Sequence, residues 1–196
     1  MDFNTLIQQR RSHYDYAKST ISDETLIQLT KDLLSTTPSA FHSQSQRIVL
    51  LLGEKHDTFW DLVLERLRYE VPEEKFPRTQ AKIQGLKNGQ GTFLFYDDTD
   101  VTKQMEERFP LYGESAQLWA YESNAMLQYA TWLGLTQLGL GASLQHYNPL
   151  IDQATQDAFQ LPTQWKLIAQ MPFGSAVDIA KTKISQPVED RMILKK

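Results

Sequence analysis

A long, predominantly apolar stretch over residues 115–138 constrains the fold of this chain more than any other segment. Its apolar side chains recur around most of the circumference of a helix, not along a single stripe. They are Leu118, Trp119, Tyr121, Ala125, Met126, Leu127, Tyr129, Ala130, Trp132, Leu133 and Leu135. Such a helix is buried on nearly every side, and at 1.5 Å per residue it would be about 36 Å long and would cross the whole domain. A chain of 196 residues can scarcely surround it alone, so we expect a second copy of the chain to pack along it.

Composition narrows the classes of protein and of chemistry. The chain has no cysteine, which excludes disulfides, thiolate metal sites and thiol nucleophiles. Redox chemistry, if present, must therefore be carried by a bound cofactor. The net charge of −4 provides no overall attraction to nucleic acid, so we expect no nucleic-acid partner.

Nothing in the sequence predicts a membrane protein. No stretch approaches the roughly 20 apolar residues of a membrane span. The long apolar helix is itself interrupted by the polar side chains of Gln117, Glu122, Asn124 and Gln128. The first residues lack the basic and apolar regions of a signal peptide, so we expect a cytoplasmic location.

The remaining pattern predicts a single α+β domain over residues 1–196. Helical spacing predicts three further helices, which are a short one ending near residue 10, one from residue 22 to about 35, and one over residues 55–69. Short apolar runs predict strands at residues 47–53, 92–96 and 165–171. Because helices predominate and do not alternate regularly with strands, α+β is favoured over a doubly wound α/β sheet.

Two segments between these elements are less regular. Residues 70–87 are charged and contain Pro72 and Pro77, so we expect them to be partly exposed. Asp97, Asp98 and Asp100 follow the second strand; they could attract a cation, but a helix-capping turn is the favoured interpretation.

Two glycines, Gly139 and Gly141, follow the long helix and precede a polar, aromatic segment. Glycine serves where the backbone takes a positive φ or approaches another surface closely. One interpretation is a Schellman-type helix end at Gly139, with Gly141 filling the turn. The other is a flat ligand lying against exposed backbone.

Three separate clusters suit a phosphorylated aromatic ligand. Arg10, Arg11 and Ser12 could bind phosphate oxygens, although a basic pair at a helix C-terminus also complements the helix dipole. The loop at residues 38–47 is rich in small donors and contains an aromatic, which ordinary loop chemistry also explains. Lys181 and Lys183 would point the same way in extended backbone, or could simply be solvated.

Other signals are weak. The four histidines show no metal-ligand spacing, so we expect no metal site. The chain also has neither a P-loop nor a Gly-x-Gly-x-x-Gly motif after a strand. Phe109 and Tyr112 could cover a flat ligand, or belong to the core.

Taken together, four motifs resemble the FMN-dependent nitroreductases, in the short branch related to fungal fatty-acid-repression nitroreductases and small bacterial nitroreductases. They occur in that family's order over essentially the whole chain. The motifs are Arg10-Arg11-Ser12, Pro38-Ser39-Ala40-Phe41-x-Ser43-Gln44, Gly139-x-Gly141-Ala142-Ser143-Leu144-Gln145-His146-Tyr147-Asn148 and Met171-Pro172-Phe173-Gly174.

This resemblance implies an α+β homodimer with two FMN sites built from both subunits. It implies an NAD(P)H-dependent enzyme that reduces nitroaromatic compounds or quinones by a ping-pong reaction in which FMN carries the chemistry. Arg10, Arg11 and Ser12 would hold the phosphate and pyrimidine side, with Lys181 and Lys183 at the phosphate. The partner chain would supply Ser39, Ala40, Phe41, His42 and Gln44, and Gly141, Ala142 and Ser143 would present backbone near the flavin N5.

Two positions depart from the usual pattern of this branch. His42 stands where asparagine is usual. Lys183 stands where arginine is frequent; lysine keeps the positive charge but cannot bind phosphate in bidentate fashion. An alternative function is a flavin-binding stress-response or regulatory protein with incidental reductase activity. A third is a helical dimerisation module without a cofactor, in which Arg10, Arg11, Lys181 and Lys183 would not converge.

Overall fold

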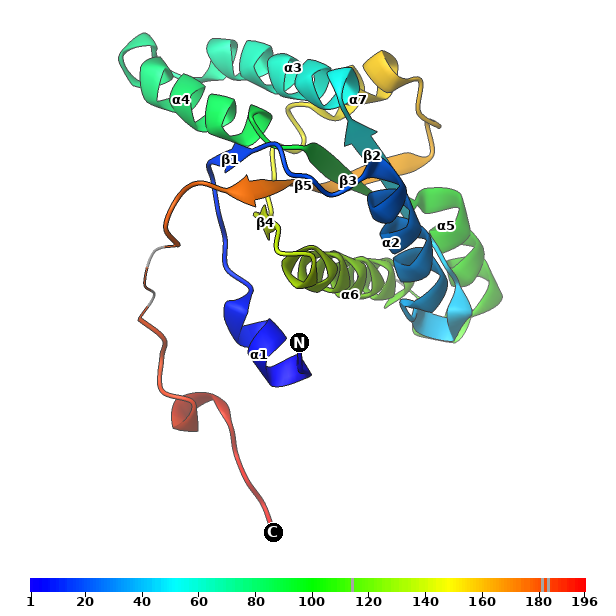
Figure 1. The fold of residues 1–196 in the computed structure, drawn as a ribbon. Helices are drawn as coiled ribbons and strands as arrows, with labels where there is room; N and C mark the ends of the chain where they lie inside the picture. Colours follow the sequence, from blue (N-terminus) through cyan, green and yellow to red (C-terminus); the bar gives the residue numbers. More distant parts are fainter. Residues whose placement is uncertain (114, 181, 183) are drawn as a thin grey trace.

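The computed structural model, which describes residues 1–113, 115–180, 182 and 184–196, is built around one antiparallel sheet (Figure 1). The strand order is β1-β5-β3-β2, and the short strand β4 also pairs with β5. Their bounds are β1 Tyr16–Ala17, β2 Gln46–Leu52, β3 Gly91–Asp98, β4 Gly141–Ala142 and β5 Trp165–Ala176. The three strands predicted from the sequence are confirmed as β2, β3 and β5, whereas β1 and β4 are too short to produce a periodic pattern.

Seven α-helices surround this sheet in the described part of the chain. They are α1 Phe3–Gln9, α2 Asp23–Thr36, α3 Glu54–Glu70, α4 Phe76–Lys87, α5 Thr99–Arg108, α6 Ser115–Gln137 and α7 Asp152–Phe159. The predictions for α1, α2, α3 and α6 are confirmed to within a few residues. The α+β class is therefore correct.

Helix α4 was missed because its proline was interpreted as an interruption. Pro77 lies in the first turn of the helix, where its missing N–H has no intrahelical partner to lose. The capping interpretation of the acidic turn is confirmed, since the Asp98 carboxylate accepts from the backbone N–H of Asp100 (3.2 Å) at the start of α5.

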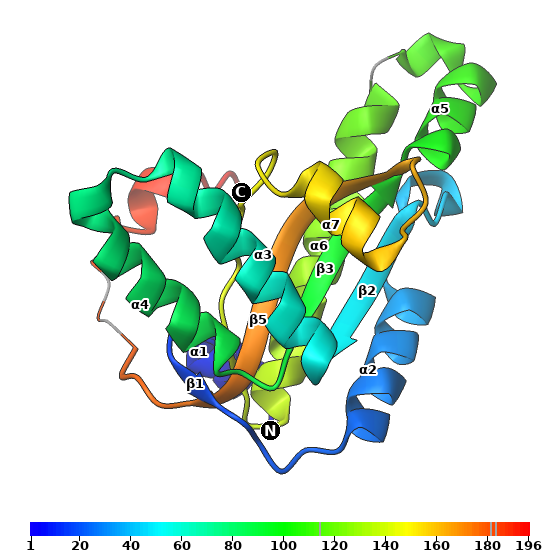
Figure 2. The same ribbon diagram turned by 90° about the horizontal axis from the view of Figure 1, so that it is seen from above.

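The central strand β3 is buried along its whole length because helices cover both faces of the sheet. Leu94 and Tyr96 belong to a core formed with α3, α4 and α7, which lie on one side in Figures 1 and 2. Phe93 and Phe95 belong to a second core formed with α2 and α6 on the other side. Alternate side chains of a strand point to opposite faces, so a doubly covered strand appears in the sequence as a continuous apolar run.

The long helix α6 lies against the sheet but is not buried on every side. Leu118, Met126 and Tyr129 remain 57%, 44% and 45% exposed and share one face of the helix. The described residues from Val177 on run away from the sheet and also include exposed apolar side chains (Figure 1). One chain alone therefore leaves an apolar helix face and an apolar C-terminal segment uncovered.

Candidate functional site

A small hollow forms where the N-terminal segment meets the end of α6 and the edge strand β4. Arg11 and His13 line it from one side, and Gly139 and Gly141 from the other. Ser12 forms a parallel bridge with Ala142, and the His13 N–H donates to the Ala142 carbonyl (3.1 Å). The structure thus brings together two of the sequence-predicted clusters, residues 10–12 and 141–143, which are about 130 positions apart.

The two arginines of the basic pair, Arg10 and Arg11, lie in different surroundings. Arg10 ends α1, where its N–H donates to the Leu6 carbonyl, and its guanidinium lies 4.4 Å from the ring centre of Trp132 on α6. Arg11 instead lines the hollow. Arg10 is thus the C-cap of α1 and packs on α6, whereas Arg11 lines the hollow.

Both glycines at this site are explained by the chain's own geometry. Gly139, at φ +77°, ends α6 in a Schellman motif, in which its N–H donates to Thr136 and the Leu140 N–H donates to Leu135. A Cβ on Gly141 would lie 2.8 Å from the Cβ of Ala176, so a larger residue would not fit there. The Schellman interpretation is correct, but Gly141 allows close packing and does not merely fill a turn.

Ser143, which follows Gly141 and Ala142, is fully buried, and its hydroxyl is hydrogen-bonded within the protein. Its hydroxyl contacts the Tyr16 hydroxyl (2.9 Å) and accepts from the Gln145 amide (3.1 Å). Burial raises the pKa of Tyr16 well above its usual range, so its hydroxyl keeps its proton and donates to the His13 carbonyl. These hydrogen bonds hold the backbone near His13 and Ser143 in place, and they occupy the Ser143 hydroxyl.

The second part of the predicted site is the loop before β2, which has an uncommon backbone. Phe41, His42 and Gln44 have φ values of 50°, 55° and 53°, in a region that non-glycine residues rarely adopt. The Ser39 hydroxyl accepts from the Gln44 N–H (2.9 Å) and holds the loop closed beside Ala40. Such strained residues concentrate at ligand sites, where the surrounding structure maintains them.

Phe41 anchors this loop in an aromatic cluster. Its ring stacks on Phe109 with centres 4.3 Å apart, and it also contacts Tyr112 and Trp119 at 6.1 and 5.5 Å. Phe41 is nevertheless 54% exposed and Tyr112 47% exposed. The cluster therefore presents an aromatic surface to solvent at the N-terminal end of α6.

The strained loop and the hollow lie at opposite ends of α6. Trp119 contacts the loop and Thr136 lines the hollow, a separation of 17 residues, or roughly 25 Å along a helix. In Figures 1 and 2 the loop before β2 lies beside α5, whereas α1 and β4 lie near the other end of α6. Within one chain, residues 39–44 are thus not brought to Arg11 and Ser12.

The predicted lysines at 181 and 183 lie outside the described residues, and the segment before them is hydrogen-bonded to the N-terminal segment. The Val177 N–H donates to the Asp15 carbonyl (3.0 Å). Asp178 then accepts from the His13 ring and from the Tyr14 N–H. Sequence reasoning missed His13 and Asp178, since no local pattern links residues so far apart.

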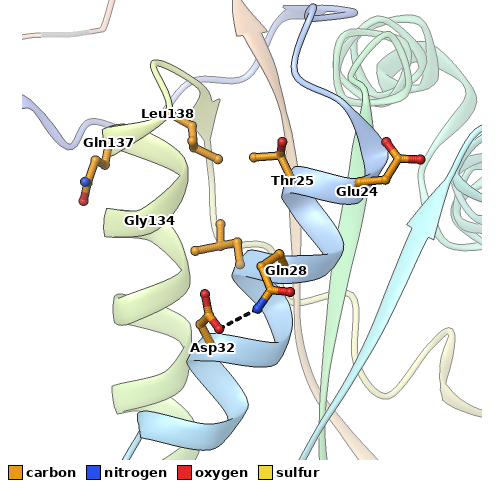
Figure 3. Close-up of a pocket in the computed structure, with 8 residues that line it drawn as sticks. Glu24, Thr25, Gln28, Asp32, Gly134, Gln137 and Leu138 are labelled. Carbon is orange, nitrogen blue, oxygen red and sulfur yellow. Dashed lines mark hydrogen bonds between the residues drawn. The ribbon is translucent and has the colours of Figure 1, made fainter.

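A larger cavity lies elsewhere. A groove of about 600 Å³ lies between α2 and α6, lined by Glu24, Gln28 and Asp32 from α2 and by Gly134 and Gln137 from α6 (Figure 3). Its only charged lining groups among the described residues are these two carboxylates, and the Gln28 amide donates to Asp32 (2.7 Å). Carboxylates repel phosphate, so this groove does not suit the phosphorylated ligand that the sequence predicts.

The described residues contain neither a metal-binding cluster nor a membrane-spanning helix. No group of three or more histidine, cysteine, aspartate or glutamate side chains could hold a metal ion. None of the described helices is long and apolar enough to cross a membrane.

Comparison with known proteins gives a consistent result. The nitroreductase family profile matches residues 7–175. The chain is 32% identical to HBN1 of Saccharomyces cerevisiae over 163 residues, which is 82% of this chain and 80% of that protein.

Solved structures agree. Nitroreductase CinD from Lactococcus lactis, in complex with chloramphenicol, superimposes with a TM-score of 0.91 at 34% identity, covering 100% of both chains. CinD has also been solved with 4-nitrophenol. A Desulfovibrio desulfuricans protein solved with FMN shares the fold, with a TM-score of 0.70 at 18% identity, covering 98% of this chain and 96% of that one. This chain has the fold of CinD, and it belongs to the nitroreductase family of oxidoreductases.

Proposed function

We propose that the protein is an FMN-dependent oxidoreductase that uses NAD(P)H to reduce nitroaromatic compounds, quinones, or both. Its family membership supports the assignment as a flavin-dependent nitroreductase. The hollow lined by Arg11 supports a binding site for the cofactor's phosphate group. We further propose that residues 1–196 act as one nitroreductase domain. The cytoplasmic location stays a prediction of the sequence.

The residues of the hollow suit the phosphate-bearing side of FMN. Arg11 offers a planar, permanently charged donor set, and the Ser12 hydroxyl lies next to it in the chain. We propose that Arg10 also contributes charge at the edge of the site, and that Lys181 and Lys183 approach the phosphate from the C-terminal segment. Gly141 and Ala142 would offer backbone to the flavin ring, with Ser143 holding that backbone in place.

The hollow is too small to hold the whole cofactor. Its volume is about 190 Å³, whereas small-molecule sites usually measure roughly 300–1,000 Å³. The missing surface must come from another element. Because the strained loop with Ser39, Ala40, Phe41, His42 and Gln44 is about 25 Å away in the same chain, we propose that a second copy supplies it.

A homodimer also accounts for the uncovered surfaces of one chain. The exposed face of α6 with Leu118, Met126 and Tyr129 would pack against the partner subunit. Burying such apolar area is favourable by roughly 25 cal/mol per Å². The same association would carry the strained loop of each chain toward the hollow of the other.

When bound, FMN would supply a hydride acceptor and donor between NAD(P)H and the substrate in a ping-pong reaction. The chain itself would bind and orient. Arg11 and the lysines would hold the phosphate, and the aromatic surface of Phe41, Phe109 and Tyr112 would stack a flat acceptor. The CinD complexes with chloramphenicol and 4-nitrophenol favour nitroaromatic acceptors.

The observation that carries this proposal is that Arg11 and Gly141 line one hollow, next to the bridge between Ser12 and Ala142. The visible absorption spectrum of the purified protein tests it. We expect flavin bands that bleach when NADH or NADPH is added without oxygen. A colourless protein that does not take up added FMN would overturn the proposal.

A flavin-binding regulatory protein remains the alternative to an enzyme. It predicts the same spectrum but a different rate. We expect turnover with NAD(P)H and a nitroaromatic acceptor to be much faster than the reaction of the reduced protein with oxygen. Comparable rates for the two acceptors would favour the regulatory role.

A further inference from the structure

His13 lines the hollow together with Arg11, and one edge of its imidazole ring lies beside Gly141. A Cβ on Gly141, which lines the same hollow, would lie 3.2 Å from the Cδ2 atom of His13. In the imidazole ring Nε2 is bonded to Cδ2. The ring edge that carries Nε2 is therefore the edge next to this lining residue.

The other ring nitrogen of His13 is held by Asp178. Nδ1 lies 2.8 Å from Oδ1 of Asp178, and the backbone N–H of Tyr14 donates to Oδ2 (2.9 Å). The side chains of His13 and Asp178 are only 18% and 28% exposed. Because an ionised carboxylate only accepts hydrogen bonds, Nδ1 must carry a hydrogen. Asp178 thus fixes both the tautomer and the orientation of the ring.

This tautomer determines what Nε2 can do. In the neutral ring Nε2 only accepts a hydrogen bond, and in the charged ring it only donates one. No group among the described residues is hydrogen-bonded to Nε2 of His13. An anionic oxygen can therefore bond to Nε2 only when the ring has taken up a proton from solvent, which gives a charge-assisted hydrogen bond.

The lining of the hollow suits an anion. Arg11 supplies a permanent positive charge, and the hollow measures about 190 Å³, which leaves room for a group of the size of a phosphate. The described lining residues include no aspartate or glutamate. Those other than Arg11 and His13 are uncharged, namely Gln9, Thr136, Gly139, Leu140, Gly141 and Ala176.

The titratable groups around His13 leave the hollow without a negative charge of its own. Both oxygens of Asp178 accept hydrogen bonds, from His13 and from Tyr14, so this carboxylate is turned toward the protein. Burial raises the pKa of Tyr16 well above its usual range, so its hydroxyl stays neutral. The Asp15 carboxylate lies toward α4, since its Oδ1 would be 3.3 Å from a Cβ on Gly85.

We propose that His13 binds an oxyanion of the phosphate type in the hollow beside Arg11, and that binding this anion places a proton on Nε2 of His13. Asp178 is then a positioning residue, because it fixes which ring nitrogen meets the anion. Where the anion is the phosphate group of FMN, this inference rests on the proposed function. Anion affinity should fall as the pH rises, because imidazole loses its charge between about pH 5 and 8.

The test uses sulfate and the full-length protein without added flavin. The charge of sulfate does not change over this range, whereas a phosphate group titrates near pH 6. On adding sulfate at pH 7, the NMR signal of the His13 ring, identified by its loss in His13→Gln, should move toward the position of a charged imidazole. Sulfate affinity should be about tenfold higher at pH 6 than at pH 8, as expected for one charge-assisted hydrogen bond.

His13→Gln tests the residue itself. Glutamine keeps an N–H donor for Asp178 but cannot take up a proton. We expect this variant to bind sulfate as weakly at pH 6 as the wild type does at pH 8. His146→Gln, which replaces an exposed histidine, is the matched control and should keep the wild-type pH profile. A His13→Gln protein with the wild-type profile, or a wild type that binds no sulfate at pH 6, would overturn the inference.

Asp178→Asn separates positioning from simple repulsion. It removes a negative charge near the anion, so repulsion alone predicts tighter sulfate binding at pH 7. If Asp178 instead supports the charged ring of His13, sulfate affinity at pH 7 should fall, and its rise should move to a lower pH. Asp190→Asn, an exposed aspartate of the C-terminal segment, is the control. Tighter binding by Asp178→Asn would overturn the positioning role.

Flavin competition identifies the source of the anion and keeps this inference separate from the proposed function. If the anion is the FMN phosphate, sulfate should displace FMN but not riboflavin, which lacks the phosphate. Sulfate binding that depends on His13 in a protein that binds neither flavin would leave the inference standing and overturn the proposed function. FMN binding without any effect of His13→Gln on sulfate binding would overturn the inference alone.

Discussion

At the scale of single residues, His56 shows how burial fixes a protonation state. It is fully buried, its Nε2–H donates to the Lys87 carbonyl (2.9 Å), and its Nδ1 accepts from the Thr92 hydroxyl (2.8 Å). Trp60 donates to the same hydroxyl (2.9 Å), which orients it toward His56. Desolvation therefore lowers the pKa of His56 to about 4.

This shift makes stability depend on pH. Between pH 6.5 and 4 the unfolded chain binds a proton at His56 that the folded chain does not, so stability is fully present above pH 6.5 and falls as the pH is lowered toward 4. The slope from this group is up to about 1.4 kcal/mol per pH unit. We expect His56→Gln to flatten the curve of unfolding free energy against pH, measured by urea denaturation. Parallel curves for the two proteins would contradict the assignment.

Arg11 is the residue in the hollow for which side-chain shape should matter. A lysine would keep the charge but lose the planar set of donors that suits phosphate. We expect Arg11→Lys to weaken FMN binding about tenfold and Arg11→Ala to weaken it further, as measured by fluorescence titration. Arg191→Ala, on the exposed C-terminal segment, is the control. Full affinity in Arg11→Lys would indicate a simple charge effect.

At the scale of elements, two helical glycines set close approaches of different kinds. A Cβ on Gly85 in α4 would lie 2.7 Å from the backbone oxygen of Tyr14. A Cβ on Gly134 in α6 would lie 2.8 Å from a methyl group of Leu29, whose side chain can rotate away. The first contact fixes α4 against the N-terminal segment, whereas the second can relax.

Replacing each glycine by alanine separates these two cases. Both changes favour the helix by up to about 1 kcal/mol. We expect Gly85→Ala to destabilise the protein by about 1–3 kcal/mol because backbone cannot give way, and Gly134→Ala to stay within about 1 kcal/mol of the wild type. Urea denaturation measures both. A stable Gly85→Ala would show that α4 can shift away from Tyr14.

The elements also show why sequence patterns succeed or fail. α6 and β3 could be predicted because long or continuous apolar runs determine them locally. β4 could not, because its two residues join the sheet only in the folded chain, where Gly141 pairs with Gly174 and Ala142 with Phe173 of β5. Helix α4 was hidden by Pro77, whose position in the first turn becomes evident only once the helix start is known.

At the scale of the whole molecule, the two parts of the candidate site lie at opposite ends of α6. If each FMN site uses the hollow of one chain and the strained loop of the other, two defective chains can complement each other. Arg11→Ala damages the hollow and Gln44→Ala damages the loop. In a heterodimer of these variants, one site carries both defects and the other carries neither.

We therefore expect the heterodimer, purified with two different affinity tags, to bind one FMN per two chains with wild-type affinity. Each variant homodimer should bind FMN weakly at both sites. The stoichiometry is measured by titration. If both parts of a site came from the same chain, every site in the heterodimer would carry one defect, and no high-affinity binding would return.

The sequence by itself determined the features that depend on neighbouring residues. The apolar helix, the buried strand, the helix end at Gly139 and the ordered motifs of the nitroreductase family are all properties of short segments. Arg11, Ser12, Gly141 and the loop at residues 39–44 could be selected in the same way, although their roles toward FMN stay predictions.

The tertiary structure decided which residues that are distant in the sequence come into contact. His13 and Asp178 are 165 positions apart, and only the folded chain shows that they form one junction. The same folding separates the strained loop from the hollow by the length of α6. Local propensity carries no information about such distances, because they follow from how helices and strands pack and not from any single segment.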